Sequence, residues 1–184
     1  MKARIESRSA LLLSAAVALA LGIGVCADAG AQTRTKVVYQ VSAAETKYTQ
    51  QHTIQVGDMP GHDIRIYEIH RTLKDGPMIE GVRMKEAWSR GYSNYTDMNG
   101  TSQVYTISVM ENGDKIFGRA DLVSQSTEKN PDGSFKSTAT VTGTLTGGTG
   151  KFLGIRGLTR TKVVSDIKAG TNAQQTELEY WMEK

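Results

Sequence analysis

A glycine-dense segment between two strand-like runs constrains this chain more than any other part of its sequence. Residues 140–161 read TVTGTLTGGTGKFLGIRGLTRT. Glycine reaches positive φ without a Cβ clash, so the backbone can reverse tightly where glycines cluster. The segment therefore predicts a sharp turn that joins two antiparallel strands. The residues assigned to this structural turn are Gly147, Gly148, Gly150, Phe152, Gly154 and Gly157, with Phe152 as an apolar plug.

The run before this turn alternates as a half-buried strand does. Val141, Gly143 and Leu145 fall on one side of an extended chain, and the threonines between them fall on the other. A second strand is expected over 158–167. Because strands flank the glycines and no GxxxxGK[ST] pattern is present, the segment is not a phosphate-binding loop.

Residues 1–31 have the layout of a cleaved export signal. Basic residues stand near the start, and an apolar run over 10–25 is short for a membrane-spanning helix. Small residues at 29–31 suit a signal peptidase, so we expect cleavage after Ala31. A lipoprotein signal at Cys26 is the alternative, but Val25 stands where such signals carry a small residue.

The remaining residues, 32–184, have a length that suits one domain with a substantial core. The sole cysteine, Cys26, lies in the removed segment, so the domain has no disulfide, thiol nucleophile or zinc thiolate. The net charge of the chain is +3, close to balance, which gives no indication of nucleic-acid binding. We expect an exported protein, periplasmic or secreted, that is not an integral membrane protein.

The domain reads as extended segments separated by turn residues, without a convincing amphipathic helix. Asn112-Gly113 predicts a type I′ hairpin, and residues 45–61 and 168–175 are expected to be connections. About eight strands with short loops favour an all-β fold, an eight-stranded antiparallel up-and-down β-barrel of lipocalin-like shape. An open β-sandwich is the alternative. The expected strands cover 35–44, 63–73, 78–97, 101–110, 115–126, 135–146, 158–167 and a last run around 178–182. Residues 78–97 are expected to form one long bent strand or two short ones, interrupted at Gly91.

The glycine-rich turn also carries a family resemblance. TLTGGTGKFLGIRG at 144–157 resembles the GGTGxFxxAxG signature of dirigent proteins, plant allene oxide cyclases and bacterial allene oxide cyclase barrel-like proteins. VYTISVMENGDKIFGRADL is similar to their central hairpin, and IQVGDMPGHDIRIYE to their early loop and second strand. The resemblance implies an eight-stranded barrel with a partly hydrophobic cavity, often assembled into homodimers or homotrimers.

The resemblance points to particular residues. In the plant cyclases a glutamate in a YEIN-like motif on the first strand takes part in ring closure, and the comparable run here begins Tyr39-Gln40. Gln40 can hydrogen-bond a substrate but cannot act as a general acid, which argues against the plant reaction. Arg156 matches the arginine of the dirigent GTGKFRxARG motif, in a family that guides a reactive phenoxy intermediate. Its alternative role is to fix the turn through backbone carbonyls.

Glu68 and His70 are two residues apart in an expected strand, so they share a face. If that face points inward, the pair is a carboxylate and an imidazole in an apolar cavity, suited to acid and base chemistry. If it points outward, both are ordinary solvated side chains, and Tyr67 and Ile69 pack inside.

Aromatic residues could line a pocket for a flat ligand, although such residues more often belong to a core or rim. The candidate ligand-binding residues are Tyr39, Gln40, Trp88 and Tyr105, and the candidate catalytic residues are Glu68, His70 and Arg156. The spacing of His52, His62 and His70 matches no zinc pattern, so no metal or cofactor is expected.

No GxSxG, HExxH or dinucleotide motif is present in the sequence. Two functions remain. The first is an exported barrel that binds a hydrophobic or phenolic small molecule. The alternative is a cyclase, isomerase or stereo-directing enzyme, which can work largely by holding its substrate in a reactive conformation.

Export gives a direct prediction. N-terminal sequencing of the mature protein should begin at Gln32, and its thermal unfolding should not respond to a reductant, because no cysteine remains. A mature protein that retains an acylated Cys26 would contradict this processing.

Overall fold

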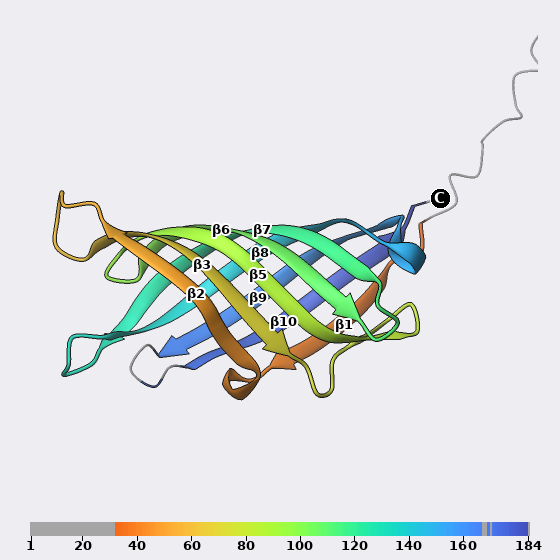
Figure 1. Ribbon diagram of the computed structural model, residues 1–184, viewed down its shortest axis with the longest axis horizontal. Helices are drawn as coiled ribbons and strands as arrows, with labels where there is room; N and C mark the ends of the chain where they lie inside the picture. The colour runs from red at the N-terminus through yellow and green to blue at the C-terminus, as the bar shows by residue number, and fades with distance from the viewer. Residues whose placement is uncertain (1–31, 167–168, 170, 184) are drawn as a thin grey trace, which may run out of the picture. The chain divides into compact units, whose positions relative to one another are not determined.

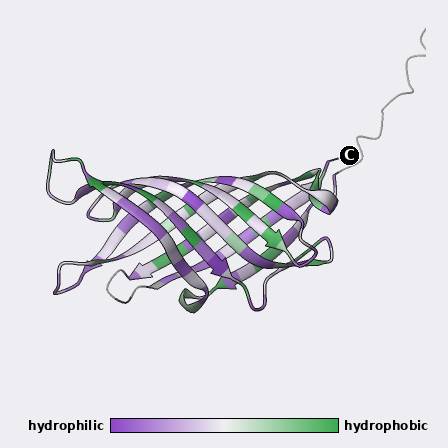
Figure 2. Ribbon diagram, viewed as in Figure 1, coloured by the Kyte–Doolittle hydropathy of each residue, from purple (hydrophilic) through white to green (hydrophobic). Residues whose placement is uncertain are grey.

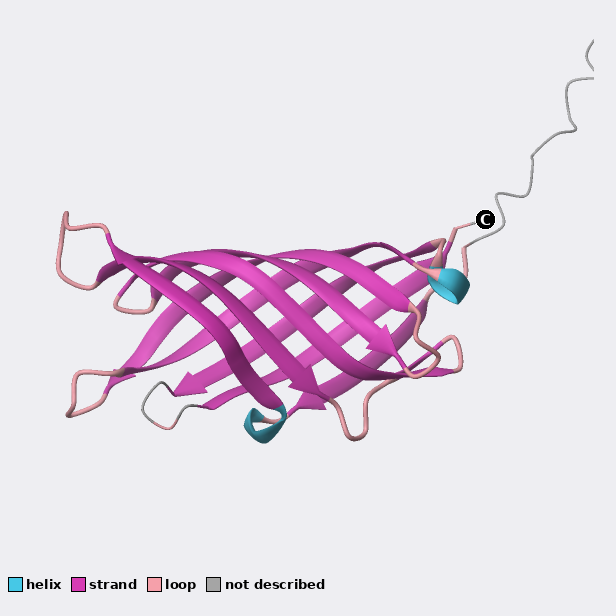
Figure 3. Ribbon diagram, viewed as in Figure 1, coloured by secondary structure: helices cyan, strands magenta, loops and turns pink. Residues whose placement is uncertain are grey.

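Antiparallel β-structure makes up almost all of the protein in the computed structural model, which describes residues 32–166, 169 and 171–183 (Figure 3). Residues Thr33–Lys184 form one compact unit. The predicted export signal, residues 1–31, lies outside the described residues. In chain order the elements are β1 (Thr35–Val41), η1 (Ala43–Glu45), β2 (Thr46–Gln55), β3 (His62–Thr72), β4 (Met78–Ile79), β5 (Val82–Thr96), β6 (Asn99–Met110), β7 (Lys115–Lys129), β8 (Phe135–Gly148), η2 (Gly150–Phe152), β9 (Ile155–Asp166) and β10 (Thr171–Met182).

The strands pair in the order β1-β10-β9-β8-β7-β6-β5-β3-β2, with β4 beside β5 (Figure 1). This confirms an all-β, antiparallel, up-and-down arrangement. Two finer predictions are wrong, because the part of the chain that the structure describes has ten strands instead of eight and its sheet is not closed. The described ladders end at β1 on one side and β2 on the other.

The two outer strands, β1 and β2, are joined through η1. The chain passes from β1 into η1, where the Glu45 carboxylate accepts hydrogen bonds from the backbone N–H and the hydroxyl of Ser42, at 3.0 and 2.8 Å. This capping box turns the chain between the outer strands. Across the seam, Asn172 of β10 donates a hydrogen bond from Nδ2 to the Tyr48 hydroxyl of β2, at 3.2 Å. A side-chain contact therefore bridges a place where no backbone ladder is formed among the described residues.

Two segments predicted to be connections are strands. Residues 46–55 form β2, an outer strand whose side chains are mostly exposed, so its sequence lacks apolar alternation. The segment 171–175 is the first part of β10, where Asn172 and Gln174 face the interior of the sheet. Apolar periodicity could not reveal either strand, since one has little buried face and the other buries polar residues.

Inward and outward side chains alternate along β8, the strand that leads into the glycine-rich turn. Ser137, Ala139, Val141 and Leu145 face inward, and the threonines between them are exposed, as predicted. Figure 2 shows hydrophilic and hydrophobic residues interspersed along the strands. The interior is therefore built from strand faces that are only partly apolar.

The apolar part of the interior gathers beside η2, the coil at the right of Figure 1. Phe152 in η2 and Ile155 in β9 are fully buried, at 0% exposure, so the Phe152 side chain packs inside the sheet next to the turn. The members of this core cluster are Val41, Leu73, Ile79, Met84, Met110, Ile116, Phe152, Ile155, Leu178 and Tyr180. This end of the interior is filled by side chains.

The glycine-rich turn needs its glycines for two different reasons. Gly150 has φ +50°, in the left-handed region that favours glycine. Gly148 does not have positive φ; a Cβ there would lie 2.5 Å from the Lys115 carbonyl oxygen and 2.7 Å from the Phe152 Cβ. Close packing against the plug, and not backbone angle, requires glycine at position 148.

The Asn112-Gly113 turn differs from the predicted type I′ hairpin. Gly113 has φ +88°, whereas Asn112 is not among the residues with positive φ. Its geometry fits a longer hairpin loop in which one glycine is left-handed. A two-residue loop with both angles positive occurs at Asp97 and Met98, with φ +49° and +66°. Neither is glycine, so the sequence gives little signal for that turn.

Replacement of Gly148 by Val should lower the free energy of unfolding by about 1–3 kcal/mol, because the new side chain overpacks the plug. Thr142→Ala on the exposed face of the same strand should change it by less than about 0.5 kcal/mol. Paired urea unfolding curves measure both. Equal midpoints for the two variants would show that the turn does not depend on close packing.

Candidate functional site

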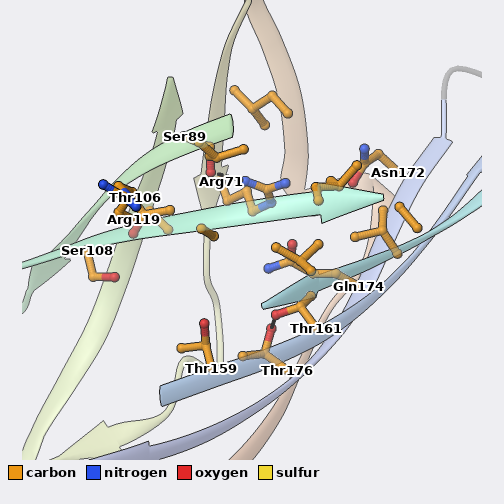
Figure 4. A pocket seen from close by; sticks show the side chains of 18 of the residues that line it. Arg71, Ser89, Thr106, Ser108, Arg119, Thr159, Thr161, Asn172, Gln174 and Thr176 are labelled. Carbon is orange, nitrogen blue, oxygen red and sulfur yellow. Dashed lines mark hydrogen bonds between the residues drawn. The ribbon is translucent and has the colours of Figure 1, made fainter. Parts of the chain in front are cut away.

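A cavity of ≈ 170 Å³ lies inside the curled sheet, and all ten strands contribute residues to its lining. Figure 4 shows part of the lining, with polar side chains from several strands directed toward one space. Small inner residues such as Ser89, Ala120, Ser137 and Ala139 leave this space unfilled. The cavity thus adjoins the packed apolar cluster beside η2 but has a more polar wall.

Arg71 of β3 is the charged group of this cavity that is most deeply buried, with 6% of its surface exposed. Its Nη1 donates a hydrogen bond to the Ser89 hydroxyl of β5, at 2.9 Å, and Figure 4 shows the two side chains together. Its Nε is buried without a partner. Among the described residues, no carboxylate forms an ion pair with Arg71.

Position on β3 explains why Arg71 is inside. Tyr67, Ile69 and Arg71 alternate along one face of the strand and all three are buried. Leu73, two residues further on, belongs to the apolar cluster beside η2. The neighbouring buried cluster contains Tyr67 and Ile69. Because the residues before and after Arg71 on this face are buried apolar side chains, the strand places the guanidinium inside the sheet as well.

Burial lowers the pKa of Arg71, whereas Tyr48, Tyr39 and Tyr67 raise it. Arginine nevertheless keeps its proton in proteins, so the cavity holds a positive charge. An unpaired buried charge is costly, since its lost hydration is not replaced by an opposite charge. The positive charge of Arg71 is therefore not balanced by a negative charge in the cavity.

Neutral tyrosine hydroxyl groups, which can donate hydrogen bonds, lie in the same cavity as the Arg71 charge. Burial raises the pKa of Tyr39 and of Tyr67, and raises that of Tyr95 to about 12. These phenols stay protonated at neutral pH. The Tyr67 hydroxyl donates to Ser102 Oγ at 2.8 Å, since Ser102 itself donates to the Tyr92 carbonyl at 2.7 Å.

The opposite wall carries short polar side chains from β9 and β10. Thr161 and Thr176 share a hydrogen bond of 2.9 Å between their hydroxyls, drawn in Figure 4. Asn172 is buried and bonds Tyr48 through Nδ2, while its Oδ1 has no partner. This wall is polar and uncharged, so it offers hydrogen bonds without neutralising Arg71.

A second hollow of ≈ 210 Å³ lies beside the turns that follow β2, β5 and β7. Arg65 and Tyr95 line both hollows. Arg65 Nη1 donates to Gln51 Oε1 at 3.1 Å, and its guanidinium lies 5.3 Å from the centre of the Tyr67 ring. Asp63 also lines the second hollow, and Asp63 Oδ1 and Arg65 Nε are both buried without a hydrogen-bond partner.

The structure separates the predicted site residues. Tyr39 lines the cavity, but Gln40 next to it is exposed on the outer face of β1. Tyr105 is 62% exposed, also on the outer face. Trp88, Glu68 and His70 do not line the cavity. Of the four predicted ligand-binding residues, only Tyr39 is therefore among the described residues that line the cavity.

Glu68 and His70 take the outward orientation, with Tyr67 and Ile69 inside. The Glu68 carboxylate accepts from the Thr49 hydroxyl at 2.6 Å and pairs with Arg90 at 2.6 Å; both contacts lower its pKa. The His70 ring stacks on Trp88 at 4.0 Å. These contacts join neighbouring strands on the outer face, as cross-strand pairs do in many sheets.

Arg156 fixes the glycine-rich turn to the C-terminal end of the described chain. Its Nη1 donates to the Ile155 carbonyl at 2.9 Å, and its Nη2 pairs with Glu183 at 3.0 Å. The Glu183 backbone N–H also donates to the Gly154 carbonyl, at 2.7 Å. These contacts match the turn-fixing alternative for Arg156.

The histidines considered for a metal have other surroundings. His62 contacts Asp58 at 2.6 Å and Asn94 at 2.7 Å, and His70 contacts Glu86 at 3.3 Å and Trp88. Within residues 32–166, 169 and 171–183, no group of three His, Cys, Asp or Glu side chains is placed to hold a metal. In the same residues no helix has the length and apolarity needed to cross a membrane.

Comparison with protein-family models found no match, and comparison with curated proteins also found none. Function must be inferred from the side chains themselves.

Sequence reasoning did not select Arg71, because arginine in a strand normally faces water. The signal was present in the parity of β3, since Tyr67 and Ile69 can be inside only if Arg71 is on the same face. Ser89 and Asn172 gave no signal of their own, because their position in the cavity depends on pairing across the sheet.

Replacement of the buried Arg71–Ser89 pair by apolar residues should stabilise the protein. The double variant Arg71→Met/Ser89→Ala removes an unpaired charge and its hydrogen-bond acceptor together, so the free energy of unfolding should rise by about 1–3 kcal/mol. Chemical denaturation measures it, with Ser89→Ala alone as the control. A loss of stability in the double variant would mean that Arg71 holds the fold together and is not kept for a ligand.

Proposed function

We propose that this protein binds a hydrophobic small molecule in the cavity between its curled strands, after export from the cytoplasm. The observation that carries the proposal is the cavity of ≈ 170 Å³ inside the curled sheet, lined by apolar and aromatic residues together with about as many polar ones, mostly Ser and Thr. Ligand sites in proteins combine apolar and aromatic side chains with polar groups. Apolar groups gain free energy on entering such a space, and the polar groups orient the ligand.

Binding is favoured over catalysis by what lines the cavity. Among its described lining residues there is no Asp, Glu, His or Lys. Proton transfer at a reacting centre generally uses one of these groups. Glu68 and His70, which could supply it, lie on the outer face. A cyclase or stereo-directing reaction would have to rely on orientation and on the arginine and tyrosine side chains of the lining.

The resemblance to allene oxide cyclase barrel-like and dirigent proteins is part of this proposal. Proteins of that kind hold a partly hydrophobic cavity inside a closed eight-stranded barrel. We propose the same mode of binding here, with a seam between β1 and β2 in place of full closure. The Tyr48–Asn172 contact at this seam supports an enclosed interior.

Filling the cavity should abolish binding. Ala139 lines the cavity and Thr140 next to it is exposed, so Ala139→Phe and Thr140→Phe add the same side chain to opposite faces of β8. Native mass spectrometry of protein purified from its own host, followed by calorimetric titration with hydrophobic and phenolic compounds, should show a ligand in the wild type. Thr140→Phe should retain it and Ala139→Phe should lose it.

Circular dichroism establishes that both variants are folded. The absence of a co-purifying ligand, together with no binding by the wild type across the panel, would contradict the proposal. Equal binding by the two folded variants would place the ligand outside this cavity.

A further inference from the structure

The guanidinium of Arg71 has no anionic partner in the cavity. A protein that keeps a fully buried cation without an acid bears a cost that an anionic ligand would offset. The buried Nε–H has no acceptor, and Nη1 is used by Ser89. Nε–H and Nη2 lie on the other edge of the guanidinium, the edge that can give a pair of parallel hydrogen bonds to one anionic group.

We propose that Arg71 anchors the carboxylate of a monocyclic aryl or alicyclic acid, with the ring packed against the apolar wall of the cavity. This inference rests on the proposed function and names the class of ligand. Tyr67, Ile69 and Val104 form the buried apolar cluster that lines the cavity on the strands beside Arg71. An acid of this class puts its charge on the cation and its hydrocarbon on that cluster.

Charge favours a carboxylate over a phosphate. A carboxylate carries one negative charge, which Arg71 neutralises, whereas a phosphate monoester carries up to two. The other deeply buried polar side chains of the lining, including Ser89, Ser137 and Thr176, are uncharged. Arg65 and Arg119 also line the cavity, but both are more exposed than Arg71, so a second negative charge would have no equally buried cation beside it.

Size favours one ring. A cavity of about 150 Å³ in another protein accepts benzene, and this one measures ≈ 170 Å³. A single ring with a carboxylate matches that volume. The surrounding strands pair on both sides of β3, so the cavity wall has little freedom to expand there.

Benzoate, benzamide and benzyl alcohol form a matched series that separates charge from ring. Calorimetric titration of the full mature protein should give benzoate an affinity roughly 10- to 100-fold above that of either neutral compound, as expected for a charge-assisted hydrogen bond in a buried site. Arg71→Met should remove that advantage and leave the neutral compounds almost unchanged. Arg90→Gln, which removes an arginine from the outer face of β5, is the matched control and should bind as wild type does.

Nuclear magnetic resonance gives a readout that does not depend on a variant. Benzoate should shift the Arg71 Nε–H signal of the wild-type protein, and benzamide should not shift it in the same way. Equal affinity for all three compounds, with no shift at Arg71, would overturn the carboxylate anchor and leave the proposed function standing. Binding of the neutral compounds but not benzoate would have the same meaning. If none of the three binds, and the wider hydrophobic panel also fails, the anchor and the proposed function are both wrong.

Discussion

Curling of one antiparallel sheet around a common interior is the constraint on which the rest of this structure depends. In such a sheet every strand sends alternate side chains to the same enclosed space, so inner residues of sequence-distant strands become neighbours. Tyr39 of β1 and Thr176 of β10 meet in this way, as do Arg71 of β3 and Ser89 of β5. The interior is consequently a property of the pairing order and cannot be assigned to any one segment.

The size and polarity of the inner side chains change along the interior of the sheet. Large apolar residues close it beside η2, where Phe152 and Ile155 are fully buried, and small polar residues line the adjoining space. The first part resembles an ordinary hydrophobic core. The second part cannot be explained as a core, because close packing normally excludes both an empty space and an unpaired charge. A region that departs from the rules of a stable interior is where a binding site is expected.

Most of the residues that the sequence suggested as site candidates make contacts outside the cavity. Ion-pair and stacking contacts between β3 and β5 involve Glu68, Arg90, His70 and Trp88. These four side chains interact with one another. Arg156 is similarly engaged by Glu183 and a backbone carbonyl. Titratable residues in close pairs on a strand surface are thus contacts between strands here, whereas Arg71 is a buried charged side chain whose Nε has no hydrogen-bond partner.

The sequence by itself determined the all-β class, the up-and-down order of most strands and the turn around Gly150 and Phe152. It could do so because alternation and glycine clustering are local, and they act through sterics within a few residues. It could not show β2 or the start of β10, since one is an exposed outer strand and the other buries polar residues. Only the tertiary structure decided that the sheet leaves a seam, that Arg71 is inside, and that Glu68 and His70 are outside. Those outcomes depend on which strands pair and how far the sheet curls, and contacts between strands distant in the chain set both.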